Sequence, residues 1–434
     1  MTRLLLIVGL AVVAALFLRT RPVVAVLVAL TAWVALPAVA VPGLTGQLSG
    51  PLAMHPATWL VMAVFTVQLV FHPRPITATM ARHPLLLLCG VIFIGGCVWT
   101  SQANGSGGLR LLLDQILAPL LIFLLLVAFA RGNQRSILLV RNTILVLAAA
   151  QAVLTLVQLR LGRMLVYEAD YATLPWFNPL KFDRWMGTTD SPLILAFLLC
   201  IAAGLAIGLR NVGLRLGLLG LYLMSALVTQ SRTGVGIICI VILYAVLRSR
   251  MAIWARAFAS VLVIVAGYVL VTSTLVAGFS SRLADDTGSA DARRRAIGFI
   301  FANWAGYLFA GEGLTASYTV GRGAGLETSI ESSILMYAVD VGWALTLVYF
   351  GAQLALILRH GFRHRLVGAT IAATIAFVLP HVSSALAWSN FTGTFLWSTL
   401  ALVVLAGTID PQPPPRTQRS GAPAAASLAT SGGP

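Results

Sequence analysis

Long apolar runs follow one another along this sequence from residue 4 to residue 408, and they limit what the chain can fold into. Most are about 15 to 25 residues long, close to the ~20 residues with which a helix crosses the hydrocarbon core of a bilayer. Hydrophobic residues make up 59% of the 434 residues and charged residues only 10%. These features predict an all-α fold, that of a polytopic integral membrane protein.

Candidate spans are apolar stretches bounded by Arg, Pro, Gly or Asn. They lie near residues 4–18, 22–41, 57–71, 84–99, 110–130, 137–159, 191–209, 213–229, 233–248, 254–276, 329–358, 366–388 and 392–408. We therefore expect about 12–13 transmembrane helices, with an N-terminal group in residues 1–160 and a second group in 161–408. The tail 409–434 is rich in Pro, Ala, Ser and Gly. That composition predicts a disordered segment.

The distribution of arginine predicts the orientation of the chain, because short cytoplasmic loops collect Lys and Arg. The loops assigned to the cytoplasm carry Arg19, Arg21, Arg74, Arg82, Arg131, Arg135, Arg141, Arg210, Arg215, Arg248, Arg250, Arg256, Arg359, Arg363 and Arg365. The intervening loops 42–56 and 389–391 contain neither Lys nor Arg and are assigned to the outside, together with the N-terminus. The net charge of +16 comes from residues that punctuate apolar segments, so nucleic-acid binding is not expected.

Charged residues on the outer side work against this pattern, and they mark three segments. In the first, LPWFNPLKFDRWMGTTDSPLILAF, Arg184 precedes a helix expected to start near Ser191, whose free N–H groups favour an anion. In the second, TQSRTG, polar residues surround Arg232 at the outer end of another span. The alternatives are an interfacial belt for the aromatic residues of the first segment and snorkelling of Arg232 to the headgroups. Together the arginines predict an anionic ligand at the outer surface, best a lipid-linked phosphate or diphosphate.

The third segment is the loop 277–328. Its stretch SADARRRAIGFIFANWAGYLF predicts an amphipathic helix on the outer membrane surface, with Ser289 as the N-cap. Two interpretations of the arginine run stay open: binding to lipid headgroups, or one or two guanidinium groups turned inward toward the ligand. The candidates for substrate binding in this loop are Arg293, Arg294, Arg295 and Arg322.

Two carboxylates stand at the outer end of the next predicted span, 329–358. Glu327 and Glu331 are four residues apart, which predicts that both lie on one helix face. They either complement the helix N-terminus electrostatically or include a catalytic general base that acts on a hydroxyl. Asp340, further along the same helix, is interpreted as a functional group or as a buried structural hydrogen bond. His55 is interpreted as incidental.

The order of these motifs resembles that of the bacterial O-antigen ligase and O-antigen polymerase superfamily of membrane glycosyltransferases. The resemblance covers residues 170–350: R-x-x-G-T with a nearby proline from Arg184, SRTG at Arg232, an external arginine-bearing helix and a Gly-rich GEG run. It implies a metal-independent, cofactor-free, inverting enzyme of the bacterial cytoplasmic membrane. Such an enzyme transfers a saccharide from a polyprenyl diphosphate donor to a glycan or glycolipid acceptor on the outer face. The resemblance also implies that Arg184, Arg232 and one of Arg293 to Arg295 hold the diphosphate.

One motif departs from the family pattern. Ligases of this family typically carry a His-Asn pair at the start of the span after the loop, and Glu331 and Ser332 stand in those places here. The departure favours a polymerase or another glycan-chain transferase over a lipid A ligase, with Glu331 as the replacement base. The competing hypotheses are a transporter or flippase of a lipid-linked saccharide, which requires charges along a membrane-crossing path, and a receptor for anionic lipid headgroups.

Overall fold

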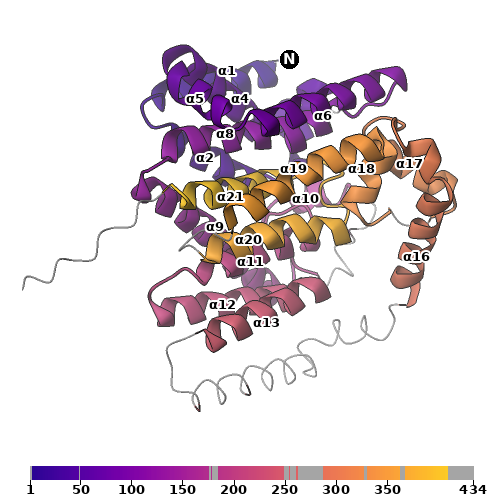
Figure 1. Cartoon of the computed structure of the whole chain (residues 1–434). Coiled ribbons are helices and arrows are strands. Elements are labelled where there is room, and N and C mark those ends of the chain that lie inside the picture. Colours follow the sequence, from indigo (N-terminus) through magenta and orange to yellow (C-terminus); the bar gives the residue numbers. More distant parts are fainter. Residues whose placement is uncertain are drawn as a thin grey trace, which may run out of the picture.

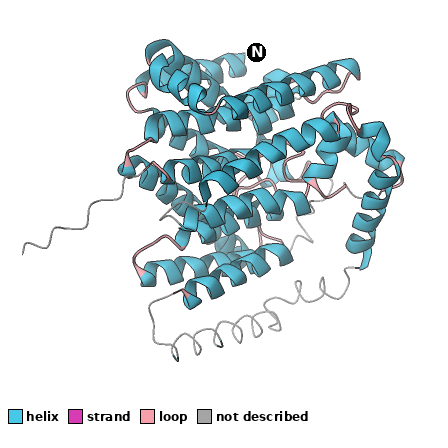
Figure 2. Ribbon diagram, viewed as in Figure 1, coloured by secondary structure: helices cyan, strands magenta, loops and turns pink. Residues whose placement is uncertain are grey.

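The computed structural model describes residues 2–47, 49–174, 177, 184–248, 254, 261, 287–326, 330–361 and 367–408. These residues form helices joined by loops and turns, and they contain no strand (Figure 2). The expected all-α fold is confirmed for this part of the chain. The predicted tail 409–434 and, apart from Trp254 and Val261, the predicted span 254–276 lie outside the described residues.

The helices closely follow the apolar runs. The first part of the chain contains α1 (Thr2–Phe17), α2 (Pro22–Ala35), η1 (Ala38–Ala40), α3 (Val41–Thr45), η2 (Pro51–Ala53), α4 (Pro56–Phe71), α5 (Pro73–Arg82), α6 (Pro84–Ala103), α7 (Leu109–Leu111), the π-helix η3 (Leu112–Leu117), α8 (Ala118–Ala130) and α9 (Gln134–Leu161). The second part contains α10 (Glu168–Tyr171), α11 (Pro192–Ala206), α12 (Val212–Val228), α13 (Arg232–Leu247), α16 (Thr287–Ala302), η5 (Trp304–Tyr307), α17 (Ala316–Gly323), α18 (Ser333–Val341), α19 (Trp343–Gly361), α20 (Val367–Val378), η6 (Leu379–Val382) and α21 (Thr392–Ala406). Proline opens several of these helices, at the position where its missing N–H costs nothing.

Several helices have the length and composition of membrane spans. Within the described ranges, 4 helices qualify: α6, the continuous helix Leu109–Ala130, α9 and α19. The number rises to 6 if two strongly bent pairs, α2 with Ala38–Thr45 and α4 with α5, are each one span. Shorter apolar helices, among them α1, α11, α12, α13 and α21, make up much of the rest of the bundle.

The core lies around α11 and α21. Every residue of α21 is buried, as is nearly every residue of α11, and such a helix, apolar all round, belongs in the interior. α21 packs against α8, α19 and α20, while α11 packs against α9, α12, α13 and α20. Figure 1 shows most of these helices running in similar directions, with α16 crossing steeply at one edge of the bundle.

The predicted span 329–358 is not one helix, and this expectation is corrected. α18 ends at Val341, and α19 begins at Trp343. Gly342 between them has a φ of +96°, a left-handed conformation that favours glycine. A Cβ at this position would lie 2.9 Å from the amide nitrogen of Ala310, so the break also lets another backbone segment approach closely.

Loops gather at two opposite ends of the bundle. Arg110 lies in the first turn of the helix Leu109–Ala130 and Arg131 directly follows its last residue, and the 22 residues of this helix span about 33 Å. At the Arg110 end, residues of segments 38–39, 107–111, 315–318 and 387–389 meet around one cavity. At the Arg131 end a second cavity is lined by Arg82, His83, Arg131, His360, Val404, Gly407 and Thr408. Arg82 and Arg131, which the arginine count assigns to the cytoplasm, both line the second cavity.

Candidate functional site

The cavity at the Arg110 end has a volume of about 340 Å³. Small-molecule sites of proteins typically fall between about 300 and 1,000 Å³. Its walls come from segments that are far apart in the sequence: Ala38, Val39, Gly107, Gly108, Arg110, Leu111, Leu174, Asp190, Thr315, Tyr318, Ala387, Trp388 and Ser389. Among the described residues, Arg110 and Asp190 are the charged side chains that line it.

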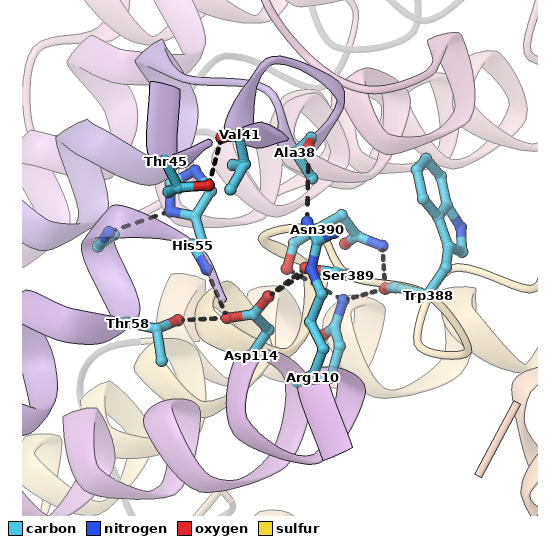
Figure 3. Close-up of polar contacts among 12 residues, drawn as sticks. Ala38, Val41, Thr45, His55, Thr58, Arg110, Asp114, Trp388, Ser389 and Asn390 are labelled. Atoms are coloured by element: carbon cyan, nitrogen blue, oxygen red, sulfur yellow. Dashed lines mark hydrogen bonds and ion pairs between the residues drawn. The ribbon is translucent and has the colours of Figure 1, made fainter. Parts of the chain in front are cut away.

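Asp114 lies beneath this cavity, fully buried, and organises a polar cluster (Figure 3). Its carboxylate accepts hydrogen bonds from the backbone N–H of His55 (3.0 Å), the hydroxyl of Thr58 (2.6 Å) and the hydroxyl of Ser389. The guanidinium Nε of Arg110, one helical turn earlier, lies 3.5 Å from its Oδ2. Asp114 belongs to the π-helix η3, and π-helical turns inside α-helices often occur at functional sites.

Arg110 is held at the edge of the cavity. Its Nη2 donates to the carbonyl oxygen of Ala38 at 3.5 Å, and its side chain is 21% exposed. Because Asp114 lies on its inner side, part of the guanidinium charge is balanced within the protein. The i, i+4 spacing of Arg110 and Asp114 is visible in the sequence and is that of an ordinary ion pair on a helix.

His55 is a structural member of the same cluster, a role that the sequence did not indicate. Its ring is fully buried and stacks on Trp33, with ring centroids 3.8 Å apart. Nδ1 accepts from the N–H of Ala57 (3.1 Å), so Nε2 carries the proton that is donated to the carbonyl of Leu36 (2.9 Å). Burial lowers the pKa of His55 to about 3, and the ring is therefore neutral at physiological pH.

Asp190 lies in the cavity wall and is only 2% exposed. Its Oδ1 accepts a hydrogen bond from the N–H of Val39 at 3.1 Å. Burial raises the pKa of Asp190 to about 7, although the amides of segment 38–39 and the charge of Arg110 act in the opposite direction. At neutral pH this carboxyl group is thus poised between its two protonation states.

The segment that carries Asp190 is rigidly held from α9. Gln158 exchanges two hydrogen bonds with the backbone of Gly187. Gln151 accepts from the backbone N–H of Thr188 and donates to the hydroxyl of the same residue. Gly187 has a φ of +65°, and a Cβ there would overlap the amide oxygen of Gln151. The G-T pair of the R-x-x-G-T motif therefore has a clear local function, which is to seat this segment on α9.

The segments that carry Arg184 and Arg232 contact each other. Nε of half-buried Arg184 donates to the carbonyl of Thr229 at 3.1 Å, in the turn that leads into α13. Arg232 is the first residue of α13, and the preceding Ser231 caps that helix by accepting from the N–H of Gly234 (3.2 Å). The predicted helix N-terminus at Ser191 is also confirmed, since its side chain accepts from the N–H of Ile194.

The predicted pair of glutamates on one helix face is wrong. Glu331 has a φ of +51° and precedes α18, which starts at Ser333, while Glu327 lies outside the described residues. The cause is Ser333, whose N–H and hydroxyl both donate to the carbonyl of Ser383, so that the start of the helix is fixed there. Glu331 is half-buried and is not among the residues that line the cavity.

The arginines of the third segment whose side chains the structure describes, Arg294, Arg295 and Arg322, do not line this cavity. Arg294 and Arg295 are exposed on α16, and the side chain of Arg293 is not described. Arg322 is exposed on α17, where its Nε donates to the carbonyl of Tyr318. An inward turn is therefore not found for Arg294 or Arg295.

The helix predicted in the loop is present as α16 (Figure 1). Ile300 is buried against residues of α18 and its flanks, whereas Ile297 and Phe301 are 44% and 65% exposed. The helix begins at Thr287, so Ser289 lies within it and is not its N-cap. A helix with exposed apolar and basic residues on its surface suits a membrane interface.

Asp340 is a structural residue. It is fully buried, and its carboxylate accepts from the backbone N–H groups of Thr315 (3.1 Å) and Ser317 (2.7 Å). Of the two interpretations drawn from the sequence, the buried hydrogen bond is confirmed. These two hydrogen bonds tie residues 315–317, at the start of α17, to the end of α18.

Comparison with known proteins finds no matching family model, no matching curated protein and no matching solved structure. The resemblance to O-antigen ligases and polymerases therefore stays a prediction. In the described part of the chain, no group of three or more His, Cys, Asp or Glu residues is arranged to hold a metal ion.

Proposed function

We propose that this chain is a membrane-embedded, inverting glycosyltransferase of the O-antigen ligase or polymerase type. It would transfer a saccharide from a polyprenyl diphosphate donor to a glycan or glycolipid acceptor on the extracytoplasmic face of a bacterial cytoplasmic membrane. The proposal includes about 12–13 transmembrane helices. It also includes an external loop whose helix α16 lies at the membrane surface. The observation that carries it is the hydrogen bond from Arg184 to Thr229 (3.1 Å), which joins the two segments bearing the motif arginines.

The proposed chemistry follows from two arginines beside helix N-termini. Guanidinium groups bind phosphate oxygens with paired hydrogen bonds and stay charged in a partly dry site. The N-termini of α11 and α13 add favourable dipoles for an anion. When an acceptor hydroxyl attacks the anomeric carbon, the bond from that carbon to the diphosphate oxygen breaks. The arginines then stabilise the leaving polyprenyl diphosphate.

The test is release of polyprenyl diphosphate by the purified protein in nanodiscs. The donor probe is a polyprenyl diphosphate carrying a radiolabelled N-acetylhexosamine, with a membrane glycolipid extract as the acceptor source. Arg232→Ala is expected to lower release by about 100-fold or more, the usual cost of losing one group that stabilises transition-state charge. Arg232→Lys, which keeps the charge without the planar fork, should fall between that variant and wild type.

Arg248→Ala is the matched control, because Arg248 stands at the other end of α13 and donates to Tyr244 in the same helix. It should behave as wild type. Neither a transporter nor a lipid receptor releases polyprenyl diphosphate, so absence of release from the wild-type protein would reject the enzyme. Full activity of a folded Arg232→Ala variant would show that Arg232 does not bind the diphosphate.

A further inference from the structure

The proposed binding of the diphosphate by Arg184 and Arg232 does not involve the cavity between Arg110 and Asp190. We propose that it is the acceptor site of the transferase: it binds the neutral end of a saccharide, and Asp190 accepts the proton of the attacking hydroxyl. This inference rests on the proposed function and adds to it both the acceptor subsite and the general base.

The charges around the cavity favour a neutral ligand over a phosphate. The guanidinium of Arg110 lies 3.5 Å from the carboxylate of Asp114, which partly neutralises it. The other charged group in the wall is Asp190, which repels an anion when it is ionised. The remaining polar side chains in the wall, Thr315, Tyr318 and Ser389, are neutral hydroxyls. Hydroxyl groups can accept hydrogen bonds from sugar hydroxyls, also where, as in Ser389, the proton is already donated within the protein.

Trp388 supplies an apolar platform of the kind on which the C–H face of a sugar ring packs. Its carbonyl oxygen accepts from the side-chain amides of Gln115 (2.7 Å) and Asn390 (2.9 Å), so its backbone is fixed. In Figure 3 its indole ring points away from this hydrogen-bonded cluster, and the residue is half-buried in the cavity wall. An aromatic surface that lines the same cavity as hydroxyl and carboxyl groups suits an amphipathic pyranose.

Asp190 follows closely in the sequence on Arg184, one of the two arginines proposed to bind the diphosphate. It lies on the same segment as Arg184, and Gln151 and Gln158 anchor that segment to α9 between them. The base in the cavity and the arginine toward the diphosphate are therefore joined by one short, fixed piece of chain. Glu331, the base predicted from the sequence, does not line the cavity.

In the proposed step, the oxygen of the acceptor hydroxyl forms the new bond to the anomeric carbon. The bond from that carbon to the diphosphate oxygen breaks, and its electron pair leaves with the polyprenyl diphosphate. The hydroxyl proton passes to the carboxylate of Asp190, so no further reactant is needed. Inversion at the anomeric carbon follows from this single displacement.

The surroundings of Asp190 determine its pH dependence. Among the described residues, the titratable groups near Asp190 are Arg110 of α7 and Tyr171 of α10, and Tyr318 of α17 lines the same cavity. Burial raises the pKa of Asp190 to about 7, and the base must be ionised to accept a proton. Transfer should therefore rise with pH through about 7 and be lost as the pH falls below it.

The experiment compares Asp190→Asn with wild type under the release assay described above, at saturating donor and from pH 5 to 9. We expect kcat to fall by about 100-fold or more and the pH dependence near 7 to disappear, while donor KM stays unchanged. Asp170→Asn, which removes a carboxylate from α10 outside the cavity wall, is the matched control and should keep the wild-type profile. A wild-type rate and pH profile in Asp190→Asn would overturn the inference.

Two further measurements keep the test decisive. If Asp190→Asn does not fold, Trp388→Leu tests the same cavity, and it should raise the KM for the acceptor several-fold without changing donor KM. Unchanged acceptor KM in that variant would overturn the acceptor site. If wild type itself releases no polyprenyl diphosphate, the proposed function fails, which is distinct from failure of the acceptor site in an active enzyme.

Discussion

At the scale of single residues, Asp114 shows how one carboxylate joins distant parts of the chain. It accepts hydrogen bonds from His55, Thr58 and Ser389 and pairs with Arg110. Each of these donors was desolvated when the helices packed. A buried donor that loses its acceptor costs about 1–3 kcal/mol, which is more than the net gain of an ordinary hydrogen bond.

We therefore expect Asp114→Ala to lower the free energy of unfolding by about 3 kcal/mol, the lower end of the range for breaking a buried ion pair, because Arg110 is partly exposed. Thr58→Ala removes one donor and should cost about 1 kcal/mol. Melting temperatures in detergent should thus rank wild type above Thr58→Ala and Thr58→Ala above Asp114→Ala. Equal melting temperatures for Asp114→Ala and wild type would show that the cluster does not stabilise the fold.

At the scale of elements, segment 311–317 docks onto the end of α18 through its backbone. The N–H groups of Glu312 and Gly313 donate to the carbonyls of Val339 (2.9 Å) and Asp340 (2.7 Å). A Cβ on Gly311 would overlap backbone atoms of residues 339–341. Close backbone contact of this kind requires glycine, and it sets where Thr315 and Tyr318 meet the cavity.

Gly311→Ala is therefore expected to destabilise the protein by about 1–3 kcal/mol, as overpacking of a tight contact usually does. Gly306→Ala is the control, since a Cβ there meets nothing within 4 Å. Melting temperature and limited proteolysis of segment 311–317 measure the effect. Equal protection of both variants would contradict the docking contact.

At the scale of the whole molecule, loops from distant parts of the chain meet at each of two opposite ends of the bundle. The Arg110 end carries Asp190 and the segment of α17, and the Arg131 end carries basic residues of several helix termini. The positive-inside rule assigns the arginine-rich end to the cytoplasm. The cavity would then open to the outside, where a lipid-linked donor and an acceptor can meet.

Cysteine labelling tests this orientation in a variant whose four native cysteines are replaced by alanine. Thr319→Cys, on an exposed position of α17, should react with a membrane-impermeant maleimide in intact spheroplasts. Gln134→Cys, exposed at the start of α9, should react after the membrane is permeabilised and not before. The reverse pattern would invert the orientation and place the proposed chemistry on the wrong side.

Much of the helical framework could be predicted from the sequence, but the candidate site could not. Arg184 and Arg232 could be found from the sequence because each stands just before an apolar run, where an arginine on the outer side is unexpected. Arg110 and Trp388 have no local signal for their cavity, because the residues that complete it lie in other segments. Glu331 was misplaced, since a contact of Ser333 with Ser383, far along the chain, decides where α18 begins.

The sequence by itself determined that the chain folds into apolar helices, where most of them begin and end, and how arginine is divided between their ends. These properties depend on hydrophobic periodicity, helix caps and proline, which act over a few neighbouring residues. The tertiary structure alone decided the break at Gly342, the cluster around Asp114 and the cavity beside Asp190. Those features depend on hydrogen bonds and close approaches between distant segments, and such pairings leave no period in the sequence.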